Sequence, residues 1–124
     1  MALAKEIMQG GLSAGTAKAI GGGYAAITAV GSAQTDAATL TAGMNMVASA
    51  NGTTGVILAG EVGDEVWVFN NSGSTLKVYP DSGAAISVAG TGVGSANAAF
   101  SQLTYKSTVY KKFTTTQWVA VTSA

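Results

Sequence analysis

Short β-prone runs recur along the chain from residue 24 onward, and each ends at a turn signal. The runs read YAAITAV, MNMVASA, TGVILAG, EVWVFN, TLKVYP, AISVAG, ANAAFSQL, STVYKKF and QWVAVT. Turn residues separate them, as in Asn51-Gly52 and Asp81-Ser82-Gly83. No helix-length segment with a 3.6-residue period lies between the runs. The spacing predicts an all-β domain, an antiparallel β-sandwich or jelly-roll-like fold, rather than a parallel α/β sheet.

The first 23 residues differ in composition from the rest of the chain. Leu3 and Ile7 stand four residues apart in ALAKEIMQ, which suits a short helix that ends at Gly10-Gly11. The Gly- and Ala-rich residues that follow favour an extended arm. A helix this short is marginal in water unless other contacts hold it. We expect an N-terminal arm at 1–23, helical, extended or frayed, and one β-domain at 24–124.

The stretch GDEVWVFNNSGSTLKVYPDSG, at 63–83, reads as a central hairpin, with the turn at NSGS. Alternate residues of a strand point to opposite faces. One face is then aliphatic and suits the interior: Val66, Val68, Leu76 and Val78. The other face carries the rings of Trp67, Phe69 and Tyr79 beside Glu65 and Lys77. We expect this ring-bearing face to be a subunit interface or to lie under a loop.

Charge is scarce in this sequence. Charged residues make up 10% of the chain, and six lysines balance six acids for a net charge of zero; typical domains carry about 25%. A surface with so few charges is either neutral and polar or buried against other molecules, and self-association is the favoured explanation. The chain has no arginine and no basic excess, so binding to nucleic acid is not expected.

The residue types that carry most enzyme chemistry are missing. The chain contains neither cysteine nor histidine, which excludes thiolate nucleophiles, disulfides, zinc–thiolate sites and the commonest general base. A Ser-x-x-Lys pattern at 74–77 falls on an expected strand, where residues three apart face opposite ways. The Gly-rich GTGVGS at 90–95 precedes no helix, unlike a nucleotide-binding loop. We therefore predict no enzymatic activity, no cofactor and no metal.

Two charged clusters are expected to be solvated. Glu61, Asp64 and Glu65 form an acidic turn, with Asp81 across the expected hairpin, and Lys111-Lys112 ends a strand. No run of 18 apolar residues is present, so no transmembrane segment is expected. The N-terminus lacks the apolar core of a secretory signal. We expect synthesis in a cytoplasm.

Five motifs carry a resemblance to a known group of proteins. They are DAATLTAGMN (36–45), GVIL (55–58), GDEVWVFNN (63–71), TLKVYP with its Ser-Gly turn (75–83) and TQW (116–118). The segment that contains them, from about Ala33 to the C-terminus, covers roughly three quarters of the chain and resembles a small β-rich module of tailed-bacteriophage virion proteins. Proteins of this kind are capsid decoration (cement) proteins or modules of tail fibres and spikes, and they commonly form trimers.

The resemblance implies a decoration protein of a phage capsid, located on the virion surface. Its partners would be itself, as a homotrimer, and the major capsid protein. The apolar residues of the arm would contact the capsid: Leu3, Ile7, Met8 and Leu12. The alternative is a fibre or spike module, in which Trp67, Tyr79 and Tyr105 stack on a host cell-surface glycan.

Overall fold

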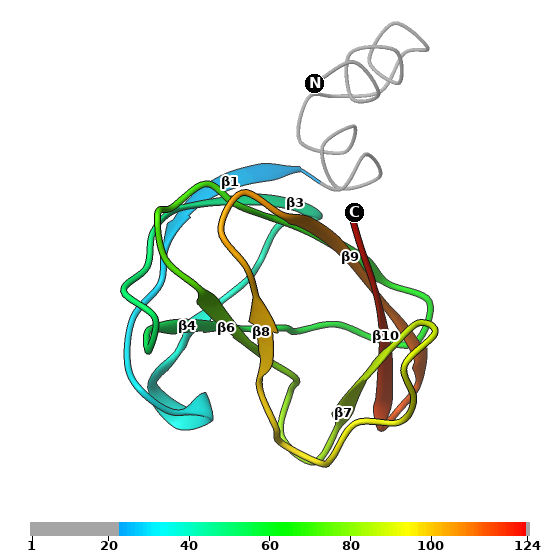
Figure 1. Cartoon of the computed structure of the whole chain (residues 1–124). Coiled ribbons are helices and arrows are strands. Elements are labelled where there is room, and N and C mark those ends of the chain that lie inside the picture. The colour runs from blue at the N-terminus through cyan, green and yellow to red at the C-terminus, as the bar shows by residue number, and fades with distance from the viewer. Residues whose placement is uncertain (1–22, 124) are drawn as a thin grey trace, which may run out of the picture.

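The computed structural model describes residues 23–123 and shows them as two β-sheets with almost no helix (Figure 1). The strands are β1 (Tyr24–Thr28), β2 (Ala38–Thr39), β3 (Met44–Ser49), β4 (Gly55–Ile57), β5 (Glu65–Asn70), β6 (Leu76–Tyr79), β7 (Ala85–Val88), β8 (Phe100–Gln102), β9 (Ser107–Thr114) and β10 (Gln117–Thr122). A short 3-10 helix, η1, covers Gln34–Asp36. The all-β prediction is confirmed, and each of the nine β-prone runs contains a strand.

The chain passes from one sheet to the other at almost every connection. The larger sheet has the order β1-β3-β5-β9-β10-β7, and the smaller has the order β2-β4-β6-β8. Consecutive strands up to β9 therefore alternate between the sheets. Many strands two apart in sequence become neighbours: β1, β3 and β5 pair in parallel in the larger sheet, as do β2, β4 and β6 in the smaller. Both sheets are mixed, since β9 pairs antiparallel with β5 and β10 in the larger sheet and β6 pairs antiparallel with β8 in the smaller.

The prediction of an antiparallel fold with a central hairpin is wrong. β5 pairs with β3 and β9, whereas β6 pairs with β4 and β8 in the other sheet. The alternation of each strand specifies which residues face inward, but a strand can meet that demand from either sheet. The turn at NSGS is a corner between sheets: Asn70 Nδ2 donates to the Ser74 carbonyl at 2.9 Å, and Asn70 Oδ1 accepts from Ser72 Oγ at 2.7 Å.

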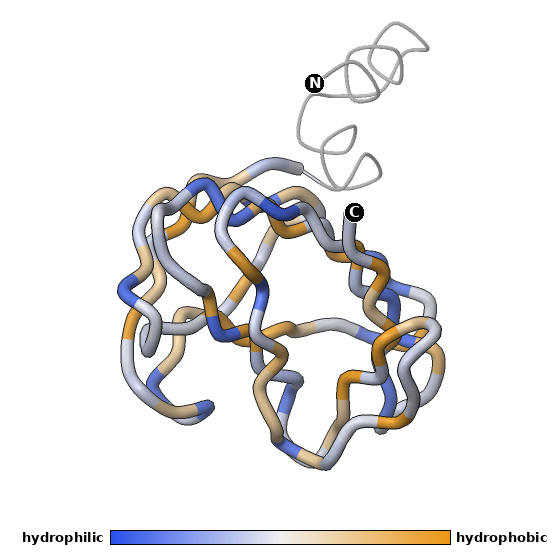
Figure 2. The backbone as a smooth tube through the Cα atoms, in the orientation of Figure 1, coloured by the Kyte–Doolittle hydropathy of each residue, from blue (hydrophilic) through white to orange (hydrophobic). Residues whose placement is uncertain are grey.

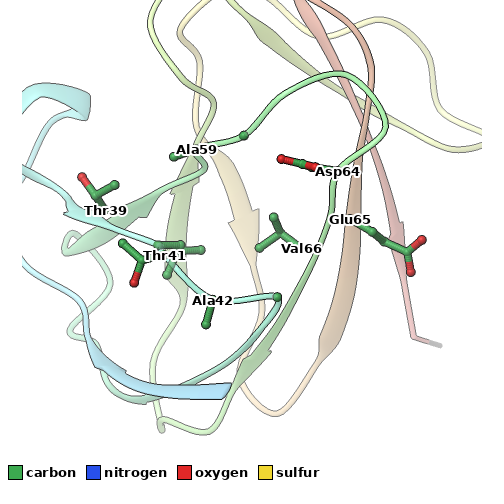
Figure 3. Close-up of a pocket in the computed structure, with 10 residues that line it drawn as sticks. Thr39, Thr41, Ala42, Ala59, Asp64, Glu65 and Val66 are labelled. Carbon is green, nitrogen blue, oxygen red and sulfur yellow. The ribbon is translucent and has the colours of Figure 1, made fainter. Parts of the chain in front are cut away.

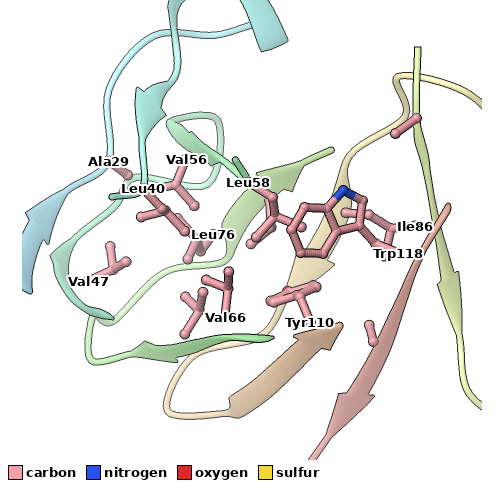
Figure 4. Packing of buried hydrophobic residues seen from close by; sticks show 14 residues of the cluster. Ala29, Leu40, Val47, Val56, Leu58, Val66, Leu76, Ile86, Tyr110 and Trp118 are labelled. Carbon is pink, nitrogen blue, oxygen red and sulfur yellow. The ribbon is translucent and has the colours of Figure 1, made fainter. Parts of the chain in front are cut away.

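Both sheets contribute to a single hydrophobic core (Figure 4). The four residues predicted for the inner face are all buried: Val66, Val68, Leu76 and Val78. The largest buried side chains are Trp118 and Tyr110, and the Phe100 ring meets Tyr110 edge-on at 6.1 Å between centroids. Hydrophobic and hydrophilic residues are interleaved along the coloured part of the tube in Figure 2, as expected for strands with one buried face.

A buried polar network ties the two sheets together. Gln102 of β8 donates from Nε2 to the Val68 carbonyl of β5 at 2.8 Å, and its Oε1 accepts the Tyr110 hydroxyl at 2.8 Å. Asn70 donates to the Gln102 carbonyl at 3.0 Å. Asn70, Gln102 and Tyr110 are all fully buried. Buried polar groups are tolerated when they are hydrogen-bonded, and this network fixes how the smaller sheet sits against the larger.

Two elements were not foreseen. The β2 strand has two residues, too few to give an alternating pattern. The η1 turn is held by Asp36, whose Oδ1 accepts the backbone N–H groups of Ser32 at 3.0 Å and Ala33 at 2.8 Å. Those two donors lower the pKa of Asp36. Gly31 lies in the left-handed region at φ 74°, and a Cβ there would collide with the Asp36 carboxylate.

Candidate interaction surface

A row of apolar side chains crosses the outer face of the larger sheet. The strand register places Tyr24 beside Met44, Met44 beside Trp67, Trp67 beside Val109, and Val109 beside Val121. Partners in register project to the same face of a sheet. Four of these five side chains are about half exposed: Trp67 47%, Met44 48%, Tyr24 51% and Val121 57%. The row therefore extends across five neighbouring strands.

A second row lies two residues along the strands. Met46 of β3 is in register with Phe69 of β5, and Phe69 with Ser107 of β9. Both apolar side chains are half-buried. The two rows enclose a shallow hollow of about 190 Å³, lined by residues of β1, β3, β5 and β9: Tyr24, Met44, Asn45, Met46, Trp67, Phe69 and Ser107. We call the outer face that these two rows form the apolar face.

One acid and one base border the apolar face. Lys111 Nζ lies 3.8 Å from Glu65 Oε2, and both side chains are nearly half exposed. The Trp67 indole Nε1 donates to Glu65 Oε1 at 3.0 Å, which fixes the ring over its own strand. An exposed ion pair adds little stability, but it places charges of both signs side by side at the edge of the apolar surface.

The structure brings together two of the three rings predicted for a subunit interface. Trp67 and Phe69 share the apolar face, as adjacent outward positions of β5. Tyr79 lies in β6 of the other sheet, so the three rings do not form one face of a hairpin. Its ring packs on Gly55, where a Cβ would come within 2.8 Å of Cε2. The predicted capsid-contact residues of the arm, Leu3, Ile7, Met8 and Leu12, lie outside the described residues.

Sequence reasoning missed the other members of the apolar face. Each of these residues occupies an outward position of its own strand: Tyr24, Met44, Val109 and Val121. The alternation of apolar and polar residues in each strand could have indicated that outward position. Strand alternation does not reveal that these four side chains lie in one row, because the row depends on the register of β1, β3, β5, β9 and β10.

The expectation that both lysines at 111–112 are solvated is wrong for Lys112, which is 6% exposed. Its Nζ donates to Asp81 Oδ2 at 2.8 Å and to the Gly60 carbonyl at 3.0 Å. It also lies 5.5 Å from the centre of the Trp118 ring. Lys111 and Lys112 are consecutive strand residues, so one must point outward when the other points inward.

Asp81 completes this cluster and is not part of the acidic turn. Trp118 Nε1 donates to Asp81 Oδ1 at 2.6 Å. Partial burial raises the pKa of Asp81, but the hydrogen bonds from Lys112 and Trp118 and the charge of Lys112 outweigh it, so the pKa lies below its ordinary value. The cluster joins the β4–β5 connection, the end of β6, β9 and β10.

A larger hollow of about 490 Å³ lies between the β2–β3 and β4–β5 connections (Figure 3). Its lining is mostly small residues, with Asp64 and Glu65 at one side. Asp64 Oδ2 accepts the Glu61 backbone N–H at 2.8 Å and closes the turn. Figure 3 shows Glu65 pointing away from Asp64 and from the hollow. Within residues 23–123, no three acidic side chains gather as a possible metal site.

No helix in the described part of the chain is long and apolar enough to cross a membrane. No protein-family model matches the chain, and no curated protein or solved structure is significantly similar to it.

Proposed function

We propose that this protein is a non-enzymatic structural component of a phage virion, a decoration protein that binds the outer surface of a capsid as an oligomer. The observation that carries the proposal is the apolar face. A chain with zero net charge leaves two rows of apolar side chains exposed across its larger sheet. Exposed apolar patches of this kind mark association surfaces.

The rest of the chain is compatible with a mechanical role. Three of its buried polar residues, Gln102, Tyr110 and Lys112, hydrogen-bond within the core and tie the two sheets and their connections together. We propose a sandwich-like packing of the two sheets on their shared core. In the decoration role, a trimer would sit on the shell and the arms of several copies would clamp neighbouring capsid subunits, with a gain from multivalency.

The alternative of a glycan-binding fibre or spike module has less support. Trp67 and Tyr79, two of the rings expected to stack on a sugar, belong to different sheets. A glycan array probed with the full chain tests this alternative. Strong, competable binding to a defined sugar would favour the fibre role over decoration.

The proposed function is tested by sedimenting the purified full-length protein with capsids of the virus that encodes it. We expect saturable co-sedimentation and a higher temperature of capsid disruption in its presence. A quadruple variant of the arm, with Leu3, Ile7, Met8 and Leu12 all changed to Ser, should bind weakly while its β-domain still melts like the wild type. Absence of co-sedimentation by the wild-type protein would refute the decoration role.

A further inference from the structure

We propose that the apolar face is the surface that a second copy of this chain covers in the assembled protein. This inference deepens the proposed function, on which it rests for the premise that the protein works as an assembly. Three properties of the apolar face favour another copy as its occupant: its area, its charge and its shape.

The exposed apolar area matches what a specific interface needs. An aromatic side chain presents about 150–250 Å², so the half-exposed Tyr24 and Trp67 leave about 200 Å² uncovered. The remaining residues of the two rows bring the apolar total to about 400 Å². A standard protein interface buries about 800 Å² on each partner, of which about 57% is apolar, or about 450 Å². The face is therefore large enough for one protein partner.

The charges favour a second copy over a partner with strong charge of either sign. The chain has six lysines and six acids, so two copies do not repel each other through net charge. The ion pair of Glu65 with Lys111 at the border presents both signs together. A strongly acidic or basic partner would be attracted by one of these two charges and repelled by the other. Another copy carries one charge of each sign and can pair with both.

The shape of the face also suits a protein surface. The hollow of about 190 Å³ among Tyr24, Met44, Trp67 and Phe69 is open and shallow. It is of a size to receive one or two side chains from a neighbour. The ring of Trp67, near the middle of the row and fixed by its hydrogen bond to Glu65, has the features of an interface anchor.

A thiol-protection experiment identifies what covers the face. The chain contains no cysteine, so Met44→Cys introduces a single thiol on the apolar face. Its alkylation rate by a maleimide is measured from about 1 µM to about 100 µM protein, a range that spans ordinary association constants. We expect the rate to fall at least about ten-fold as concentration rises. Val93→Cys, at a loop position that is 84% exposed, is the control and should react equally fast throughout.

Two other outcomes overturn the inference. Full reactivity of the Met44→Cys thiol at every concentration would mean that the face stays open. Equal protection at every concentration in a protein whose native mass is that of the monomer, 12.2 kDa, would mean that a segment of the same chain, such as the N-terminal arm, covers it; equal protection in an oligomer would mean that the second copy is tightly bound across the whole range. Either of the two contrary results would leave capsid binding to be judged by co-sedimentation, so failure of this inference is distinguishable from failure of the proposed function.

A charge substitution tests the same surface through the native mass. Trp67→Lys should weaken association at least about 30-fold, because it removes an aromatic anchor and buries an unpaired charge. If Trp67→Lys fails to fold, Val121→Lys is tested in its place, because it adds the charge without removing a ring. Val93→Lys is the matched control and should associate like the wild type. A wild-type protein with a mass of 12.2 kDa at about 100 µM, or unchanged association of folded Trp67→Lys or Val121→Lys, would refute the proposal.

Discussion

The two faces of strand β9 carry side chains that polarity alone would not place there. On β9 the inner face carries Thr108, Tyr110 and Lys112, all buried, whereas the outer face carries Val109 and an exposed Phe113. The inner polar groups are stable because each has a partner, as Lys112 has in Asp81. The outer apolar groups have no cover in the described residues. The comparison teaches that strand alternation, rather than side-chain polarity, decides which residues face the core.

The largest loss of stability is expected from a charge placed on the inner face. Val68→Asp should unfold the domain, because Val68 is fully buried among apolar side chains. The introduced carboxylate would have no cation beside it. We expect a loss above about 4 kcal/mol, which is comparable to the whole stability of many domains. Circular dichroism melts check this. Trp67→Asp, one residue along and on the outer face, is the control and should remain folded; a folded Val68→Asp protein would reverse the assignment of the faces.

The next largest effect separates the two neighbouring lysines. Lys112→Met should destabilise the fold by about 2–3 kcal/mol, because it leaves Asp81 without its cation. The loss stays moderate because the Asp81 side chain is 31% exposed and can be hydrated. Lys111→Met should change stability by less than about 1 kcal/mol, since its pair with Glu65 is exposed. Urea unfolding of both variants decides the matter, and equal effects would mean that Lys112 is not a core residue.

A smaller effect is expected at the buried hydroxyl of Tyr110. Tyr110→Phe removes the donor to Gln102 Oε1 and should lower stability by about 1–2 kcal/mol. Burial raises the pKa of Tyr110 well above its ordinary value. The native state therefore keeps this proton at a pH where the unfolded chain loses it, so stability falls as pH rises above about 10. Ultraviolet titration should show one tyrosine that ionises only on unfolding, and that signal should vanish in Tyr110→Phe.

The smallest expected effect is the loss of folding stability at low pH. The pKa of Asp81 is lowered in the folded state, so its contribution is complete above the unfolded value of about 3.9 and is lost as pH falls toward the folded value. Stability of the wild type should therefore decline below about pH 4. Asp81→Asn should be less stable at neutral pH and show a shallower acid decline. An identical acid slope in both proteins would mean that other carboxylates cause the decline.

The sequence predicted much of this fold and part of the candidate surface. Each of the nine β-prone runs contains a strand, and the inner faces of β5 and β6 follow from Val66, Val68, Leu76 and Val78. The sequence predicts a ring-bearing face of Trp67, Phe69 and Tyr79, and the structure keeps Trp67 and Phe69 together on the outer face of β5 while Tyr79 lies in the other sheet. The missed elements are short, as β2 is, or depend on a local hydrogen bond, as η1 does on Asp36.

The sequence by itself determined the all-β class, the approximate position of most strands and the inward residues of β5 and β6. It did so because turn residues and period-two alternation are local properties of the chain. Only the tertiary structure decided which strands are neighbours. Asn70 turns the chain from one sheet to the other, so β5 and β6 do not pair, and the register of five strands aligns Tyr24, Met44 and Trp67 with Val109 and Val121. Pairing and register depend on contacts between distant segments, which no local pattern encodes.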